Sequence, residues 1–239
     1  MLNRIRIVLI NTSHPGNIGS VARAMKTMGL NQLYLVEPQF FPHQKADELA
    51  VGATDILKQA KVMSNLEAAI ADCALVVGTS ARTRTIPWPL LTPRVMAETV
   101  KQEPSTSEIA IIFGREQSGL TNEELQRCHL HIQIPANPEY SSLNLAAAVQ
   151  VIAYELRVAS LEEVQSVEEW DYPLATTDEM EKFYLHLQEV LIAIDFLKVN
   201  APRKLMTRLR RLFSRARPDT MEMNMLRGIL AAMQDTIRK

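Results

Sequence analysis

The feature that most constrains the fold is an alternation, over residues 1–160, between short apolar runs and segments with a helical pattern. The runs are almost continuously apolar, as in IRIVLI and IAIIF, and such runs are typical of parallel strands buried on both faces of a sheet. We expect strands at residues 5–10, 33–36, 74–78, 109–113 and 131–134. Helices are expected at about 17–28, 46–51, 65–71, 92–101, 121–127 and 142–159. The alternation predicts an α/β domain with a mostly parallel sheet.

The charge of the chain is distributed unevenly, although the net charge is only −1. Residues 1–160 carry 14 basic and 14 acidic side chains, and residues 161–182 carry eight acids and one base. Residues 196–218 carry eight bases and no acid. A solvated helix face usually contains compensating acids, so this basic block predicts a polyanionic partner.

The C-terminal part of the chain has the pattern of a small helical module. Thr177 is the expected N-cap of a first amphipathic helix, Pro202 opens a second helix, and Asp219 opens a third. We therefore predict three parts: a sheet domain at residues 1–160, an acidic linker at 161–177, and a basic helical domain at 178–239.

Several classes of protein are excluded by composition and cysteine usage. The longest apolar stretches are too short to cross a bilayer, and the N-terminus has no small-residue cleavage site. Cys73 and Cys128 belong to no CxxC pair and have no histidine at ligand spacing, so free thiols are expected. We expect a cytoplasmic protein with neither a membrane segment nor a metal site.

The segment NTSHPGNIGSVARAMKTMGL, residues 11–30, is the expected turn between the first strand and the first helix. Its glycines, Gly16 and Gly19, match neither GxGxxG nor GxxxxGK[ST]. Asn17 and Arg23 lie on a polar face of the predicted helix, away from its apolar face. Ligands in such sheets bind beyond the carboxyl ends of the strands, so Arg23 is a candidate site residue.

Three further loops follow predicted strands: GTSARTRTIPWP, FGREQSGLTNEEL and IPANPEYSSLNLAAAVQVIAYE. Each alone fits an ordinary turn. Together, FGREQSGLTNEEL and PANPEYSSLNLAAAV resemble the second and third motifs of the SPOUT class of RNA methyltransferases, and NTSHPGNIGSVARAM resembles the first motif of its TrmH-like, ribose 2′-O-methylating branch. The likeness continues into PRKLMTRLRRLFSRA and is greatest to bacterial enzymes that methylate cytidine or uridine of tRNA.

This resemblance implies a fold, a reaction and an assembly. The fold is a SPOUT domain with a deep C-terminal trefoil knot, followed by a helical tRNA-binding domain. The reaction is S-adenosylmethionine-dependent 2′-O-methylation of a tRNA ribose, with cytidine or uridine 32 of the anticodon loop as the implied target. The assembly is a homodimer in which the partner chain completes each active site, and the helix at 142–159 is a candidate interface.

The resemblance also implies site residues. Arg23 matches the catalytic arginine, and Asn17 and Ser142 would orient the ribose or the arginine. An arginine is a poor base, so we expect Arg23 mainly to bind the adjacent phosphate and to stabilise the developing alkoxide, while Gly16 and Gly19 let RNA approach the helix start. The expected cofactor-binding residues are Thr79, Ser80, Ala81, Gly114, Glu116, Ile134, Ser141, Ser142, Leu143 and Asn144. A bond that stabilises its own turn is an equal alternative for Glu116.

RNA contacts are expected from both domains. The residues are Arg82, Arg84, Arg115 and Tyr140, and in the basic block Arg203, Lys204, Arg208, Arg210, Arg211 and Arg215. For the three arginines of the first group, ordinary solvent-facing positions are equally compatible with the sequence. Tyr140 equally fits a place in the core or at a dimer interface.

Other functions stay open at this point. The chain could be a non-catalytic cofactor- and RNA-binding protein, or could methylate another RNA nucleotide. Arg23, Asn17 and Ser142 argue against a non-catalytic protein. An NAD-type oxidoreductase would use an acid about twenty residues after the glycine loop, where Glu37 stands, and would bind NAD instead of S-adenosylmethionine.

Overall fold

The sheet domain is built as the apolar runs predict. The computed structural model describes residues 1–80, 90–162, 171–198 and 204–237. Within these residues a seven-stranded sheet has the order β3-β2-β1-β6-β4-β7-β5, with every neighbouring pair parallel. The strands are β1 (Ile5–Ile10), β2 (Gln32–Val36), β3 (Lys61–Met63), β4 (Cys73–Thr79), β5 (Leu90–Leu91), β6 (Glu108–Phe113) and β7 (Leu130–Ile132). The central strand β1 is buried throughout, and β6 is buried from Ile109 to Phe113.

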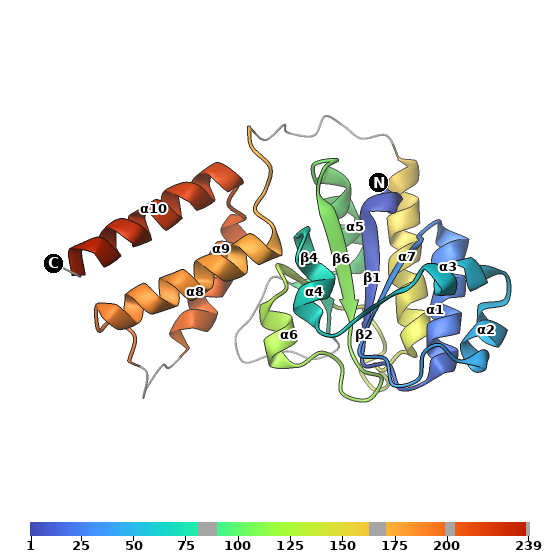
Figure 1. Cartoon of the computed structure of the whole chain (residues 1–239). Coiled ribbons are helices and arrows are strands. Elements are labelled where there is room, and N and C mark those ends of the chain that lie inside the picture. Colours follow the sequence, from blue (N-terminus) through green and yellow to red (C-terminus); the bar gives the residue numbers. More distant parts are fainter. Residues whose placement is uncertain (81–89, 163–170, 199–203, 238–239) are drawn as a thin grey trace.

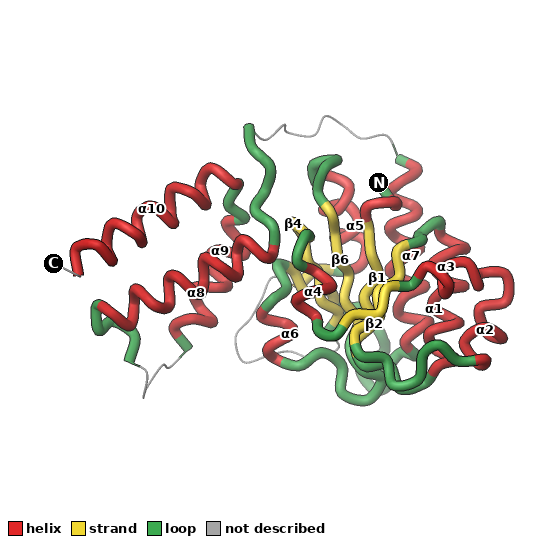
Figure 2. Tube along the Cα trace, viewed as in Figure 1, coloured by secondary structure: helices red, strands yellow, loops and turns green. Residues whose placement is uncertain are grey.

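Helices cover both faces of this sheet, and a helical module lies beside it (Figure 1). On one face lie α1 (Pro15–Met28), α2 (Gln44–Ala50), α3 (Thr54–Gln59), α5 (Pro93–Gln102) and α7 (Leu145–Leu161). On the other face lie α4 (Leu66–Ile70) and α6 (Asn122–Gln126). The module consists of α8 (Thr177–Ala193), α9 (Leu205–Ala216) and α10 (Thr220–Ile237). Figure 2 shows the three helices grouped apart from the strands.

The five expected strands are confirmed, and the differences involve short elements and boundaries. Two strands and one helix were not predicted: β3 and β5 are three and two residues long, and α3 has six. Elements of this length carry no measurable periodicity. The helix expected at 142–159 begins at Leu145, because the side chain of Asn144 accepts a hydrogen bond from the Ala146 amide and caps it.

The expected N-cap of α8 was wrong by one residue. Thr176 is the cap: its hydroxyl accepts from the Glu179 amide, and the Glu179 carboxylate accepts from the Thr176 amide. Thr177 is instead buried, and its hydroxyl donates to the Cys73 carbonyl oxygen at 2.8 Å. The sheet domain and the module therefore touch where α8 begins.

The helical module has a core of its own. Met180, Phe183, Tyr184, Val190, Met223 and Leu230 are buried in it. The rings of Phe183 and Phe213 meet edge to face, with centroids 4.8 Å apart, which joins α8 to α9. Cys73 and Cys128, both in the sheet domain, are buried free thiols.

The strand order brings the loops that the sequence singled out to one edge. β1, β6, β4 and β7 are consecutive in the sheet and parallel, so the loops that follow them share its carboxyl edge. The knot implied by the resemblance stays a prediction, because the loop after β4 includes residues 81–89, which lie outside the described residues.

Candidate active site

A cavity of about 240 Å³ opens at the carboxyl edge of the sheet, between the ends of β4 and β6 and the start of α7. Its lining consists of Thr79, Ser80, Gly114, Arg115, Glu116, Gln117, Ser118, Gly119, Leu120, Ile132, Ile134, Ser141, Ser142, Leu143, Leu145 and Ala148. Eight of the ten predicted cofactor residues are among these. Of the other two, Asn144 caps α7 beside the cavity, and Ala81 lies outside the described residues.

Sequence reasoning missed part of this lining. Gln117, Ser118, Gly119 and Leu120 belong to the second motif, which was quoted as a segment but reduced to Gly114 and Glu116. The glycines at both ends of this segment indicate a loop that folds back on itself. All residues on the inner side of such a loop line the same cavity, so the whole segment could have been predicted.

The loop at 114–119 is held closed by its own backbone. The amides of Arg115 and Gly119 each donate to the carbonyl oxygen of the other residue, and Gly119 has φ 69°. A Cβ on Gly114 would lie 2.1 Å from the carbonyl carbon of Gly119, so only glycine fits there. The Arg115 guanidinium binds both oxygens of Glu124, at 3.0 and 3.1 Å. Arg115, predicted to contact RNA, is thus engaged in bracing its own loop.

Glu116 joins this loop to the first motif. Its carboxylate accepts hydrogen bonds from the Ser13 amide (3.2 Å), the Ser13 hydroxyl (3.1 Å), the His14 amide (3.3 Å) and Asn17 Nδ2 (3.0 Å). These partners belong to the loop after β1 and to the first turn of α1, so Glu116 makes structural bonds to the first motif as well as to its own backbone. Burial acts to raise the pKa of Glu116, but the hydrogen bonds from Asn17 and from the backbone amides of Glu116 itself, Ser13 and His14 outweigh it and lower that pKa.

Asn17 connects all three motifs through its side-chain amide. Its Nδ2 donates to Glu116, and its Oδ1 accepts from Asn144 Nδ2 at 3.1 Å. Asn144 in turn caps α7, on which the third motif continues. Both ends of the Asn17 amide are therefore used within the protein, in positioning the loops around the cavity.

Arg23 lies on α1 but outside the cavity lining. The residue is exposed, and within the described part of the chain its guanidinium has no ion pair or hydrogen bond. One chain thus brings Ser142 to the cavity and leaves Arg23 on the outer surface of α1.

The glycines of the first motif lie against helix α2. A Cβ on Gly19 would lie 2.0 Å from the carbonyl oxygen of Ala46, and a Cβ on Gly16 would lie 2.8 Å from Leu49 Cδ1. Both partners are on α2. Gly19 therefore allows α1 to pack closely on the α2 backbone, and the approach of RNA at Gly16 and Gly19 stays a prediction.

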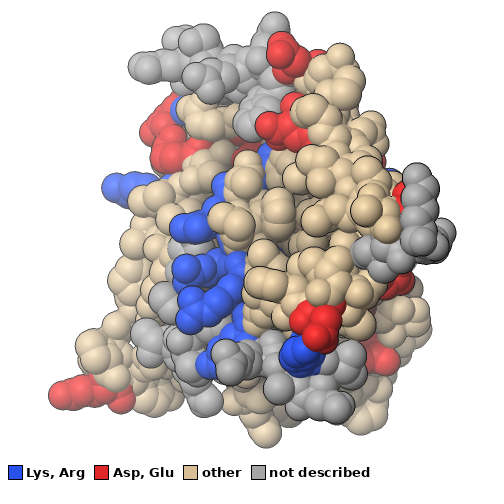
Figure 3. All heavy atoms as spheres, turned by 90° about the vertical axis from the view of Figure 1, so that its left-hand side faces the viewer, with Lys and Arg blue, Asp and Glu red and all other residues tan. Residues whose placement is uncertain are grey.

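The predicted RNA contacts divide into three groups. Arg82, Arg84 and Arg203 lie outside the described residues. Tyr140 is 80% exposed, so its alternative reading as a core residue was wrong. Lys204, Arg208 and Arg215 are exposed on α9, and within the described residues none of the three has an acidic partner. We name these three residues the basic face. Figure 3, which views the molecule from the side of the module, shows a strip of Lys and Arg side chains down this surface.

Arg210 and Arg211 are less exposed than the basic face. Both terminal nitrogens of Arg210 bind the Glu181 carboxylate, one of them at 2.8 Å, and its guanidinium lies 4.3 Å from the Tyr184 ring centroid. Arg210 therefore joins α9 to α8 through its ion pair, and its contact with RNA stays a prediction. Arg211 is half-buried.

Two kinds of site are absent from the described residues. Across residues 1–80, 90–162, 171–198 and 204–237, no three His, Cys, Asp or Glu side chains form a group that could hold a metal ion. In the same residues no helix combines the length and apolarity that a membrane crossing requires.

Known proteins match the chain over both parts. The model of the SpoU rRNA Methylase family matches residues 4–154, and the model of the tRNA methyltransferase TrmJ C-terminal domain matches residues 178–239. The tRNA (cytidine/uridine-2′-O-)-methyltransferase TrmJ of Escherichia coli (strain K12) is 54% identical over 237 residues, 98% of this chain and 96% of that protein.

Solved structures agree with these matches. TrmJ from Z. mobilis ZM4 aligns with a TM-score of 0.84 at 33% identity, over 96% of this chain and 98% of its own. A probable methylase family protein from Haemophilus influenzae Rd KW20 aligns with a TM-score of 0.65 at 47% identity, over 100% and 99%. The methyltransferase AviRb from Streptomyces viridochromogenes, solved in complex with AdoMet, shares the fold at 21% identity and a TM-score of 0.52, over 65% and 60%.

Proposed function

The chain belongs to the SpoU rRNA methylase family, and we propose that it transfers a methyl group from S-adenosylmethionine to the ribose 2′-hydroxyl of a cytidine or uridine in tRNA. One observation carries the proposal: the second and third motifs line one cavity, and Asn17 of the first motif is joined to both of them by hydrogen bonds to Glu116 and Asn144. The 54% identity to a tRNA methyltransferase over 98% of the chain supports the substrate.

The lining of the cavity fits S-adenosylmethionine. The cofactor has a neutral adenosyl group, a zwitterionic amino-acid end and a sulfonium, but no phosphate, so it needs small residues and backbone groups rather than a phosphate-binding cradle. Gly114, Gly119, Ser141 and Ser142 provide such a surface, and the charge of Arg115 is taken up by Glu124. When bound, the cofactor supplies an electrophilic methyl group on a sulfonium.

The protein's part in the reaction is to hold the 2′-oxygen and to ease loss of its proton. The oxygen has to lie about 3 Å from the carbon that it attacks, in line with the bond that breaks. Ser142 lines the cavity, and in this proposal it orients the ribose. Arg23 supplies a fork of donors for the neighbouring phosphate and for the developing alkoxide, while Asn17 positions the loops.

In the proposed homodimer, Ser142 and Arg23 of one active site come from different chains. The inner side of α7 is buried in its own domain, while its outer side carries an apolar stripe: Ala147, Val151, Tyr154, Val158 and Leu161. Tyr154 is 52% and Leu161 70% exposed. α1 packs beside α7, so a second copy on this stripe would find Arg23 at its edge. Each cavity would then receive the arginine of the partner chain.

The finer features of the function form part of the same proposal. The substrate nucleotide is cytidine or uridine 32, the basic face holds the tRNA backbone, and the enzyme acts in the cytoplasm, where tRNA is. Residues 1–160 form the methyltransferase domain, 161–177 the linker and 178–239 the tRNA-binding domain.

The test is a single-turnover assay with methyl-labelled S-adenosylmethionine and tRNA, on the wild-type protein and on Arg23→Lys. Lysine keeps the charge but loses the fork, so we expect the wild-type protein to transfer the label and the variant to be slower by about 10- to 100-fold. Cofactor affinity should be unchanged, because the proposed contacts of Arg23 are to the RNA phosphate and the 2′-oxygen and not to the cofactor. Tight tRNA binding without transfer would favour a non-catalytic binding protein, and a full rate in Arg23→Lys would remove Arg23 from the mechanism.

A further inference from the structure

A buried ion pair fastens the helical module to the sheet domain at a point remote from the cavity. Arg217, which ends α9, binds both oxygens of Glu103, which ends α5, and one of these contacts is 2.7 Å long. Arg217 Nη2 also donates to the Ala74 carbonyl oxygen at 3.3 Å. The Glu103 side chain is 5% exposed and that of Arg217 20%. We call this pair the latch.

The backbone conformation of Arg217 indicates that its side chain is needed. Its φ is 51°, in the left-handed region where a helix usually ends with glycine. Arginine is unfavourable in this backbone conformation, but its side chain reaches Glu103 in the sheet domain, which glycine could not do.

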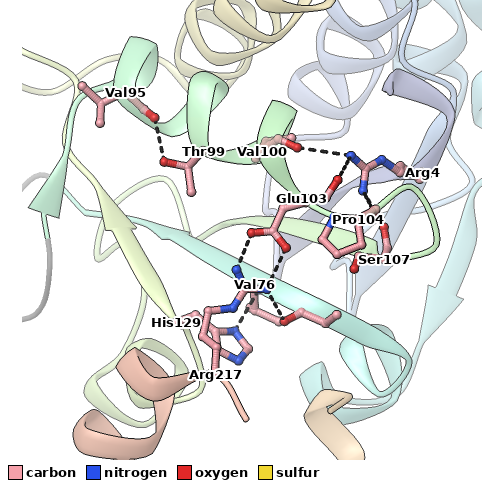
Figure 4. Close-up of polar contacts among 11 residues, drawn as sticks. Arg4, Val76, Val95, Thr99, Val100, Glu103, Pro104, Ser107, His129 and Arg217 are labelled. Carbon is pink, nitrogen blue, oxygen red and sulfur yellow. Dashed lines mark hydrogen bonds and ion pairs between the residues drawn. The ribbon is translucent and has the colours of Figure 1, made fainter. Parts of the chain in front are cut away.

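Glu103 is held in place from behind. Figure 4 shows its carboxylate facing Arg217 and its backbone facing Arg4. The Arg4 guanidinium donates to the carbonyl oxygens of Val100 (3.2 Å), Glu103 (2.9 Å), Ser107 (3.2 Å) and Pro104. The turn after α5 is therefore held by contacts within the sheet domain itself.

The latch works together with contacts at two other points. At the start of α8, Thr177 donates to the Cys73 carbonyl oxygen and the Asp178 amide to that of Ala71. In the first turn of α9, the Thr207 hydroxyl donates to Gln126 of α6 at 3.4 Å. α6 directly follows the loop that lines the cavity. Attachment at three separated points defines both the place and the rotation of α9.

A buried ion pair contributes little net stability, since desolvation opposes the attraction, but it requires one geometry. We infer that Glu103 and Arg217 are positioning residues for methyl transfer: they orient the basic face so that tRNA bound there presents its target ribose to the cavity. This inference rests on the proposed function. In this inference the latch orients the module relative to the cavity, and it does not itself bind tRNA.

Kinetics separate alignment from binding. Arg217→Gly removes the latch and suits the left-handed backbone, and Glu103→Gln removes the charge while keeping the shape. We expect either variant to lower kcat/KM for tRNA by about tenfold, with tRNA and cofactor dissociation constants within about twofold of wild type. The double variant should fall no further than either single variant, because the two residues act through one contact.

Two control variants lie in the same module. Lys182→Ala removes a cation whose ion pair with Asp178 is exposed and local to α8, and it should leave every constant unchanged. Arg208→Ala removes a cation of the basic face and should weaken tRNA binding itself. Unchanged kcat/KM in Arg217→Gly and Glu103→Gln, or an equal loss of tRNA affinity in both, would overturn the inference.

A distance measurement tests the latch without activity. Spin labels at Glu98→Cys on α5 and Asn224→Cys on α10, both exposed positions, should give a narrow distance distribution that broadens in Arg217→Gly. The native thiols are buried and should not react. An unbroadened distribution would contradict the latch whether or not the protein methylates tRNA, whereas absence of transfer by the wild-type protein would contradict only the proposed function.

Discussion

Glu116 connects two loops that are 99 to 103 residues apart in the chain. Its carboxylate lines the cavity and accepts four hydrogen bonds from the segment that begins α1. Because Asn17 continues this network to the cap of α7, one acid holds the first and second motifs in register and acts on the third.

Replacing Glu116 by glutamine should impair both stability and catalysis. Hydrogen bonds to a charged acceptor contribute about 1.5–3 kcal/mol each, and glutamine keeps only one acceptor oxygen and no charge. We expect a loss of about 2 kcal/mol in the free energy of unfolding and a slower methyl transfer, measured by denaturant unfolding and single turnover. Glu123→Gln, at an exposed position of α6, is the matched control and should behave as wild type.

The same substitution has a consequence for pH dependence. The hydrogen bonds lower the pKa of Glu116, so the stability they confer is complete above the unfolded value of about 4.3. It is lost as the pH falls below that value through the folded pKa. Stability of the wild-type protein and of Glu116→Gln should therefore converge in acid; a constant difference between the two down to pH 2, roughly the lower limit of folded carboxyl pKa values, would contradict this role.

Among single residues, sequence reasoning succeeded where strand direction alone decides proximity. Gly114 follows β6 and Ser141 and Ser142 follow β7, two parallel strands on either side of β4, and eight residues implied by the family resemblance line one cavity. The partners of Glu116 could not be predicted, because they depend on β1 lying beside β6, an order that no local pattern contains. The cap at Thr176 was within reach: a threonine three residues before Glu179 is a capping box, and Thr177 has no such partner.

Among elements, α1 and α2 show how packing can imitate a ligand loop. The glycines at 16 and 19 suggested an approach site, yet they face Ala46 and Leu49 of α2. An approach site for RNA and a close helix contact both require a residue without a side chain. The sequence alone therefore does not distinguish the two interpretations.

Gly19→Ala is expected to destabilise the sheet domain. The new Cβ would meet the Ala46 carbonyl oxygen at 2.0 Å, a backbone atom that can retreat only if the helices separate. Overpacking of this kind costs about 1–3 kcal/mol, more than the roughly 1 kcal/mol that alanine gains in helix propensity. Gly228→Ala on α10 is the control: nothing lies within 4 Å of its Cβ position, so it should stabilise slightly. Equal effects in thermal unfolding would contradict the packing role.

The basic helix α9 uses its arginines in different ways, and salt dependence can separate them. Arg208 is exposed and without an acidic partner among the described residues, whereas Arg210 is paired with Glu181. Arg208→Ala should reduce the slope of log K for tRNA against log salt by about one. Arg210→Ala should lower the thermal stability of the module and leave that slope unchanged. A reduced slope in Arg210→Ala would indicate instead that Arg210 contacts tRNA.

At the scale of the whole molecule, the proposed dimer has a direct test on the outer stripe of α7. Tyr154→Glu places a charge in the centre of this stripe, where burial of an unpaired carboxylate is strongly unfavourable. We expect the variant to be monomeric in light scattering and to lose methyl transfer, because Arg23 can then reach no partner cavity. Thr99→Glu on α5, away from the stripe, should remain as wild type. A Tyr154→Glu dimer with full activity would refute this interface.

The sequence was sufficient to predict an α/β domain followed by a helical module, but not how the module is attached to the domain. Buried apolar runs gave the parallel sheet, and the basic block indicated a polyanion-binding module. The attachment of that module was not predictable, because Arg217 and Glu103 are 114 residues apart and each alone reads as a surface charge.

The most direct test of the central claim is to map the methyl group. Wild-type protein is incubated with methyl-labelled S-adenosylmethionine and unmodified tRNA, and the product is digested and sequenced by mass spectrometry. We predict one added methyl group on the ribose 2′-oxygen of cytidine or uridine 32. A methyl group on a base, or no transfer to any tRNA, would contradict the account.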